Sequence, residues 1–173
     1  MNGENMVSSA DVIPVAIVGA AGRMGRMLVQ TVHTEDDMSV VAAVEREDSS
    51  FVGADAGAVA GIGDIGVTIG SSLERALAVS AACIDFTLPG PTVDHARTCR
   101  SQRRAMVIGT TGLSPEQLAI VEDAAGDIAI VHAPNMSIGV NLCFKLLDVA
   151  ARALGDSVDI EIIEAHHRNK VDA

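Results

Sequence analysis

From position 12 the sequence reads Val12-Ile13-Pro14-Val15-Ala16-Ile17-Val18-Gly19-Ala20-Ala21-Gly22-Arg23-Met24-Gly25. The apolar run at residues 12–18 predicts a buried strand. Residues 23–33, with Met24, Leu28 and Val32 on one side, predict a helix. The glycines between them give a tight turn, let a pyrophosphate approach the backbone, and aim helix N-terminal amides at it. The stretch therefore favours a dinucleotide site, although a purely structural glycine turn has the same spacing.

An acidic residue follows where a dinucleotide site needs one. Glu45 stands 20 positions after Gly25, at the end of a second apolar run at residues 38–44. A carboxylate there can bind the ribose hydroxyls of adenosine. Arg46 beside it could cover the adenine or hold a 2′-phosphate, so the sequence permits both NADH and NADPH. Arg23 either reaches a phosphate or lies on a solvated helix face.

The same alternation continues along the chain. Residues 47–66, rich in Gly, Ala and Asp, predict a long and partly functional loop. Ser114-Pro115-Glu116-Gln117 opens a helix, with Ser as N-cap, Pro at the first position and Gln completing a capping box. Further strands are expected at residues 67–69, 82–86, 105–108, 128–131 and 158–165, and further helices at residues 72–79, 91–103 and 138–154.

Strands alternating with helices predict an α/β fold with a Rossmann-like doubly wound parallel sheet. The last helix and strand fall outside this repeat and predict a bridge into a second, α+β domain for substrate binding and oligomerisation. We therefore expect a flexible tail at residues 1–11, a dinucleotide-binding domain at residues 12–136, and the bridging helix and first strand of an incomplete substrate domain at residues 137–173.

The composition limits the partners. The 173 residues carry a net charge of −11, which disfavours non-specific binding to nucleic acid or to an anionic membrane, but not binding of a small anion. The three cysteines are widely spaced in apolar or helical stretches, which predicts buried or half-buried thiols in a reducing cytosol. The sequence shows neither a secretory signal pattern nor an apolar run of about 20 residues, so we expect a cytoplasmic protein.

Three later strands also end in small or polar groups. Ligands of open α/β sheets bind beyond the carboxyl ends of the strands, where these groups would gather. Each segment alone is compatible with an ordinary loop, but together they favour a site for a nicotinamide ring and its ribose. The segments are Asp85-Phe86-Thr87, Gly109-Thr110-Thr111-Gly112 and Ala133-Pro134-Asn135-Met136-Ser137.

The end of the sequence gathers groups suited to proton transfer. His166, His167, Arg168 and Lys170 fall within five positions of an otherwise acidic chain. Imidazole exchanges protons near neutral pH, and the cations can hold a carboxylate. A metal site is disfavoured because neighbouring residues of an extended segment point to opposite sides, and a solvated basic turn is the other alternative. The remaining histidines, His33, His95 and His132, have no such neighbours and are expected to be structural or at the surface.

Taken in order, these segments resemble the dihydrodipicolinate reductase family of bacterial lysine and diaminopimelate synthesis. The resemblance runs from about residue 12 to residue 173, and its most specific part is the final motif. The segments that carry it are Gly19-Ala20-Ala21-Gly22-Arg23-Met24-Gly25, Glu45-Arg46, Ile84-Asp85-Phe86-Thr87, Val107-Ile108-Gly109-Thr110-Thr111-Gly112 and Glu164-Ala165-His166-His167-x-x-Lys170-x-Asp172-Ala173.

The resemblance implies an enzyme that transfers hydride from NADH or NADPH to a cyclic, unsaturated dicarboxylate, 4-hydroxy-tetrahydrodipicolinate. It implies that the glycine turn holds the pyrophosphate and that Glu45 and Arg46 hold the adenosine ribose. His166 would be the proton donor and acceptor, Lys170 a proton donor, and His167 a substrate contact. The residues that would line the nicotinamide are Gly109, Thr110, Thr111, Ala133, Pro134, Asn135 and Met136.

The chain departs from the family pattern after Ala173. The family continues with Pro-Ser-Gly-Thr and a substrate domain that also forms a homotetramer. We therefore expect the 173 residues to be a fragment or the first part of a longer protein. A polypeptide that ended at Ala173 should bind nucleotide with little or no turnover. Two alternatives remain: another Rossmann oxidoreductase of amino-acid metabolism, which should lack the Glu-x-His-His-x-x-Lys pattern, and a nucleotide-binding module without catalysis.

Overall fold

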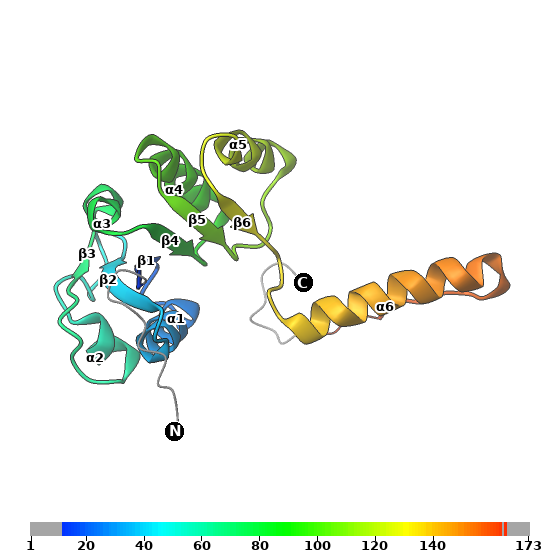
Figure 1. Ribbon diagram of the computed structural model, residues 1–173, viewed down its shortest axis with the longest axis horizontal. Helices are drawn as coiled ribbons and strands as arrows, with labels where there is room; N and C mark the ends of the chain where they lie inside the picture. Colours follow the sequence, from blue (N-terminus) through cyan, green and yellow to red (C-terminus); the bar gives the residue numbers. More distant parts are fainter. Residues whose placement is uncertain (1–11, 164, 166–173) are drawn as a thin grey trace, which may run out of the picture. The chain divides into compact units, whose positions relative to one another are not determined.

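The computed structural model describes residues 12–163 and 165 and divides into two compact units, Met1–His132 and Ala133–Ala173. The first unit contains a six-stranded parallel sheet in the order β3-β2-β1-β4-β5-β6 (Figure 1). This is the order of a doubly wound dinucleotide-binding sheet, so the predicted fold class is confirmed. The strands are β1 (Ile13–Val18), β2 (Met38–Val44), β3 (Ile69–Gly70), β4 (Ala82–Asp85), β5 (Ala105–Ile108) and β6 (Ile130–His132).

Helices cover both faces of this sheet. Figure 1 shows α3, α4 and α5 on one face, and α1 with the short α2 on the other. A sheet buried on both faces explains why its strands are continuous apolar runs rather than alternating ones. The helices of the first unit are α1 (Arg23–Thr34), α2 (Ala56–Ala60), α3 (Leu73–Val79), α4 (Pro89–Ser101) and α5 (Pro115–Ala125).

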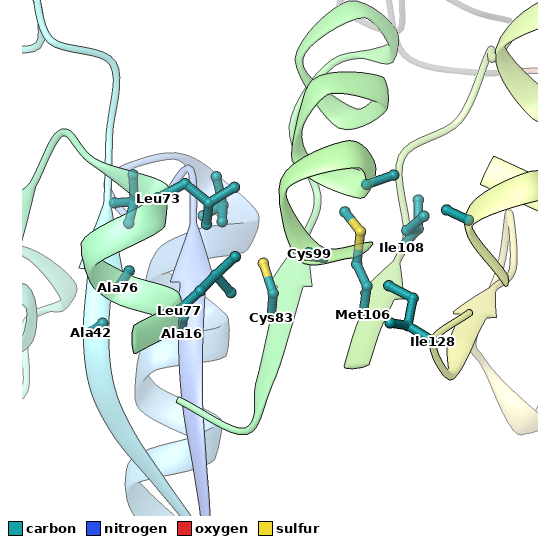
Figure 2. Close-up of a cluster of buried hydrophobic side chains, with 14 of the residues drawn as sticks. Ala16, Ala42, Leu73, Ala76, Leu77, Cys83, Cys99, Met106, Ile108 and Ile128 are labelled. Atoms are coloured by element: carbon teal, nitrogen blue, oxygen red, sulfur yellow. The ribbon is translucent and has the colours of Figure 1, made fainter. Parts of the chain in front are cut away.

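The larger core cluster lies between the sheet and helices α3, α4 and α5. Leu73 and Leu77 of α3 pack toward Ala16 and Cys83 of the sheet, and Met106 of β5 continues the layer (Figure 2). Ala16 and Cys83 have small side chains, which leaves room on the strands for the larger leucines of α3. The opposite cluster centres on Ile17, which is fully buried.

The inward side of α1 differs from the prediction. Gly25, Val29 and Val32 are buried, whereas Met24 is 42% exposed. A Cβ atom built on Gly25 would lie 2.0 Å from the carbonyl oxygen of Gly19, so the helix must present this glycine to the turn. That requirement rotates Met24 outward.

The segment at residues 47–66 is also more ordered than a loop. It contains α2, whose N-cap Asp55 accepts hydrogen bonds from the amides of Gly57, Ala58, Ile65 and Gly66. One carboxylate thus ties the start of α2 to the end of the segment. The run of Ala and Gly has no helical periodicity, and only the Asp55 cap signals the short helix.

The described part of the second unit contains α6 (Ile138–Leu154) and a 3₁₀ turn at Gly155–Ser157. The bounds of α6 agree with the prediction, and Ser137 caps it by accepting the amide of Val140. Residues 158–163 form no strand, contrary to the prediction, because no other strand of the described second unit lies beside them to pair. Among the described residues, no helix is long and apolar enough to cross a bilayer.

Candidate dinucleotide site

A cavity of about 470 Å³ opens where the strand order reverses, between the carboxyl ends of β1 and β4. Open parallel sheets bind ligands at this point because the connections on either side leave in opposite directions and part to form a crevice. The cavity draws on the loops after β1, β2, β3 and β4. Its lining residues are Val18, Gly19, Gly22, Val44, Glu45, Arg46, Ser71, Leu73, Phe86, Thr87, Leu88, Pro91 and His95.

The glycine turn has no room for a side chain at Gly19 or at Gly25. Gly19 has a φ of +68°, and a Cβ there would lie 2.8 Å from Cγ2 of Thr87. The amide of Gly22 donates to the carbonyl of Gly19 at 3.0 Å, which closes the turn. Gly22 is the N-cap of α1 and has no side chain with which to cap it. The first-turn amides of α1 therefore suit an anionic ligand.

Glu45 links the turn to the end of β2. Its Oε1 accepts the amide of Ala21 at 2.9 Å, and its own amide donates to the carbonyl of Gly70 at 2.9 Å. The carboxylate is thus fixed at the rim of the cavity, next to the glycine turn. A carboxylate held there has further lone pairs that can accept ribose hydroxyls. The structure brings Glu45 and Arg46 to the same cavity as the glycine turn, as the sequence predicted.

A buried carboxylate supports the other side of the cavity. Asp85, at the end of β4, is fully buried; its Oδ1 accepts the amide of Thr87 at 2.8 Å and the hydroxyl of Thr87 at 2.6 Å. Its Oδ2 lies 2.7 Å from Nδ1 of His95 on α4. Burial raises the pKa of Asp85, but the bonds from His95 and Thr87 outweigh burial, so the pKa lies below its usual value. The ionised carboxylate can only accept, so Nδ1 of His95 carries the hydrogen.

The loop after β5 packs beneath the same cavity. A Cβ on Gly109 would lie 2.0 Å from the ring of Phe86, so this glycine leaves room for the ring. The buried hydroxyl of Thr110 lies 2.8 Å from that of Thr92 on α4, which ties the loop to the helix. The loops after β4 and β5 therefore pack together, as expected for neighbouring parallel strands that end at the same edge of the sheet.

His95 is the functional candidate that the sequence analysis missed. It was expected to be structural or at the surface, yet it lines the cavity and contacts Asp85. The two residues are ten positions apart on different elements, so local spacing gives no signal. The one available clue was Asp85 itself, because an acid at the end of an apolar strand needs a partner once it is buried.

The structure places the other candidates as follows. Arg23 and Met24 are exposed on the first turn of α1, and Ala21 is half-buried within the glycine turn. Ala133, Pro134, Asn135 and Met136 belong to the second unit, where Asn135 Oδ1 accepts the amide of Ser137 ahead of α6. His166, His167 and Lys170 lie outside the described residues.

The three cysteines differ in burial. Cys83 and Cys99 are buried as predicted, and the pKa of Cys83 is raised by its contact with Cys99 and by burial, which leaves it protonated and unreactive. Cys143 is exposed, contrary to the prediction, because it lies on α6, whose residues are not covered within the second unit. Residues 12–163 and 165 contain no group of three His, Cys, Asp or Glu side chains arranged to hold a metal ion.

Comparison with known proteins gives consistent matches over both units. The family model "Dihydrodipicolinate reductase, N-terminus" matches residues 13–136, and "Dihydrodipicolinate reductase, C-terminus" matches residues 139–173. The 4-hydroxy-tetrahydrodipicolinate reductase of Alkalilimnicola ehrlichii is 61% identical over 159 residues, which cover 92% of this chain and 60% of that protein. The reductase of Acinetobacter baumannii is 52% identical, with 92% of this chain and 58% of that protein covered.

A solved structure supports the same assignment. The dipicolinate-bound dihydrodipicolinate reductase from Paenisporosarcina sp. TG-14 superposes with a TM-score of 0.67 at 28% identity, covering 81% of this chain and 54% of that one. The chain therefore spans about three fifths of the length of the curated relatives that it matches.

Proposed function

This chain belongs to the dihydrodipicolinate reductase family, and from this premise we propose that it serves the NADH- or NADPH-dependent reduction of 4-hydroxy-tetrahydrodipicolinate in lysine and diaminopimelate synthesis. The observation that carries the proposal is the cavity at the reversal of strand order, with a carboxylate fixed beside a three-glycine turn. Such a site fits a dinucleotide with two ribose groups and a diphosphate.

The chain's own groups account for cofactor binding. The amides after Gly19 and at the start of α1 would hold the diphosphate, and Glu45 would accept the ribose hydroxyls. Arg46 would flank the adenosine. Gly109, Thr110 and Thr111 would lie toward the nicotinamide, together with Ala133, Pro134, Asn135 and Met136 of the second unit. Met24 and Arg23 complete the cofactor-binding set that we propose.

The reduction also needs an acid. A bound NAD(P)H supplies the hydride, and hydride addition to an unsaturated ring leaves charge on the substrate that a nearby acid must quench. We assign proton donation and acceptance to His166 and proton donation to Lys170. His167 would contact a carboxylate of the substrate. The dicarboxylate class agrees with the dipicolinate bound to the reductase from Paenisporosarcina sp. TG-14.

The domain organisation that we propose follows from these roles. We propose residues 12–136 as the dinucleotide-binding domain and residues 137–173 as the start of the substrate domain. In the whole protein that domain would also form a homotetramer, and the enzyme would act in the cytoplasm on a small molecule, without nucleic acid or membrane partners.

The first experiment tests the cofactor site. The chain is titrated with NADH and with NADPH while nicotinamide fluorescence is recorded. Saturable binding is expected for at least one of them, and Glu45→Ala should weaken NADH binding about tenfold or more by removing the ribose acceptor. Glu35→Ala, an exposed acid after α1, is the matched control. Binding of neither nucleotide by a folded chain would contradict the proposal.

The second experiment tests the protonation role. Residues 1–173 are continued with the remaining part of the Alkalilimnicola ehrlichii relative, and NADH oxidation is followed with substrate generated by a coupled synthase. His166→Gln should lower kcat about 10²- to 10⁴-fold with little change in NADH affinity. His33→Gln, at an exposed histidine of α1, should leave kcat unchanged. An unaltered rate in His166→Gln would remove the role assigned to that histidine.

A further inference from the structure

The proposed function puts the adenosine ribose of a dinucleotide beside Glu45, so the charges around Glu45 bear on which dinucleotide the site prefers. Glu45 lies on the cavity wall with its carboxylate fixed by the amide of Ala21. A ribose with a free 2′-hydroxyl can donate to this carboxylate, whereas a 2′-phosphate would meet like charge. A phosphorylated ribose therefore depends on a nearby cation to offset that repulsion.

Arg46 is the cation in position to do so. Among the residues that line the described cavity, it is the only Arg or Lys. The neighbouring Arg26 is engaged elsewhere, because its Nε donates to the carbonyl of Ala21 at 2.8 Å and its guanidinium lies 5.2 Å from the ring centroid of Phe51. Discrimination between the two dinucleotides therefore rests on how available the Arg46 guanidinium is.

The turn after β2 gives Arg46 a competing partner. The amide of Ser49 donates to the carbonyl of Arg46 at 2.9 Å, which closes a four-residue turn and brings Asp48 back toward Arg46. Nη1 of Arg46 lies 3.7 Å from Oδ2 of Asp48. Residues 45–48 carry three carboxylates, those of Glu45, Glu47 and Asp48, and one guanidinium, that of Arg46.

We propose that Asp48 is a specificity-determining residue: by pairing with Arg46 at the cavity rim, it makes this site favour NADH over NADPH. The inference rests on the proposed function. Asp48 acts through Arg46 rather than on the nucleotide. Both side chains are mostly exposed, at 78% for Arg46 and 73% for Asp48, so the pair is screened by salt and its effect is of moderate size.

The test measures dissociation constants for NADH and NADPH on the chain, at low salt and at about 0.15 M salt. The unaltered chain should bind NADH more tightly. Asp48→Asn should tighten NADPH binding about two- to fivefold, with a smaller change for NADH and a smaller gain at the higher salt. Circular dichroism checks that the exposed substitution leaves the fold intact.

Two further variants separate the ion pair from general charge. Glu47→Gln removes the same charge from the same turn, but Glu47 forms no ion pair with Arg46 in the described structure, so its gain for NADPH should be smaller. In an Arg46→Gln background, Asp48→Asn should give no more NADPH affinity than Glu47→Gln does. The Arg46→Gln background removes the part of the gain in NADPH affinity that depends on the pairing of Asp48 with Arg46.

The outcomes are distinguishable. Equal or tighter binding of NADPH by the unaltered chain overturns this inference and leaves the proposed function standing. Equal gains from Asp48→Asn and Glu47→Gln, or a full gain without Arg46, also overturn it. Binding of neither nucleotide overturns the proposed function and this inference with it.

Discussion

Nδ1 of His95 donates to Oδ2 of Asp85 across 2.7 Å, and the same carboxylate holds both the amide and the hydroxyl of Thr87. Thr87 in turn lies against Gly19, where an added Cβ would come within 2.8 Å of its methyl group. A contact chain therefore runs from α4 through the end of β4 to the glycine turn. The shape of the cavity depends on a carboxylate that a ligand cannot reach directly.

Asp85→Asn should destabilise the first unit by about 3 kcal/mol. The substitution removes the buried negative charge to which Thr87 and His95 donate their hydrogen bonds. The folded-state pKa of Asp85 is lowered, so its contribution is complete above the unfolded pKa of about 3.9 and is lost as the pH falls through the folded value. Urea unfolding of both proteins between pH 3 and pH 7 measures this difference. It should be constant above about pH 5 and shrink below about pH 4.

A difference that stayed constant into acid would mean that the pKa of Asp85 is the same in the folded and unfolded states, so that the pairing with His95 and Thr87 does not lower it. Asp94→Asn is the matched control. Asp94 is an exposed acid on the same helix as His95, paired with Arg97 in a surface contact. Its substitution should change the free energy of unfolding by less than about 1 kcal/mol at any pH in this range.

Gly25→Ala should abolish NADH binding and lower the stability of the first unit. The new methyl group would lie 2.0 Å from the carbonyl oxygen of Gly19 and 2.7 Å from the Cα of Ala20, and both are backbone atoms that cannot move without opening the turn. Fluorescence titration and thermal melting measure the two effects. Gly90→Ala in α4 is the control, since no atom lies within 4 Å of the added Cβ. It should be neutral or slightly stabilising, and a similar loss in both variants would refute the steric argument.

Most of the fold followed from local pattern. The strands at Met38–Val44 and Ala105–Ile108 and the helix at Ile138–Leu154 have the predicted bounds, because apolar runs and caps mark them clearly. The capping box of Ser114 and Gln117 is also present as predicted. The glycine turn and Glu45 could be predicted as one site because their spacing along a βαβ unit fixes where they meet.

What the sequence did not reveal depends on contacts that spacing along the chain does not specify. Asp85 and His95 form a pair only after α4 has packed beside β4, and Asp48 reaches Arg46 only through a backbone turn. Residues 158–163, the described run of the strand expected at residues 158–165, form no strand for a related reason. Alternation predicts a pleat, but a strand also needs a neighbour to accept its hydrogen bonds.

Gly109→Ala should weaken NADH binding because its methyl group would lie 2.0 Å from the Phe86 ring, which lines the cavity. The ring would have to move, which changes the wall of the cavity. Phe86→Leu shortens this side chain, so the double variant should recover part of the affinity that Gly109→Ala loses. Dissociation constants from the four proteins of this cycle give the coupling between the sites. Strictly additive losses would show that the loop after β5 acts on the nucleotide without Phe86.

Asp55→Ala should lower the midpoint of thermal unfolding and loosen the segment between β2 and β3 first. Its carboxylate accepts four backbone amides, from Gly57 and Ala58 at the start of α2 and from Ile65 and Gly66 at the far end of the connection. Without it these amides have only solvent to bond, and α2 loses its cap. Hydrogen exchange should therefore rise at Ile65 and Gly66 before it rises in the sheet. Asp64→Ala, at an exposed acid in the same connection, should leave the exchange pattern unchanged. Equal protection in Asp55→Ala and the unaltered chain would show that the connection is held by its own packing.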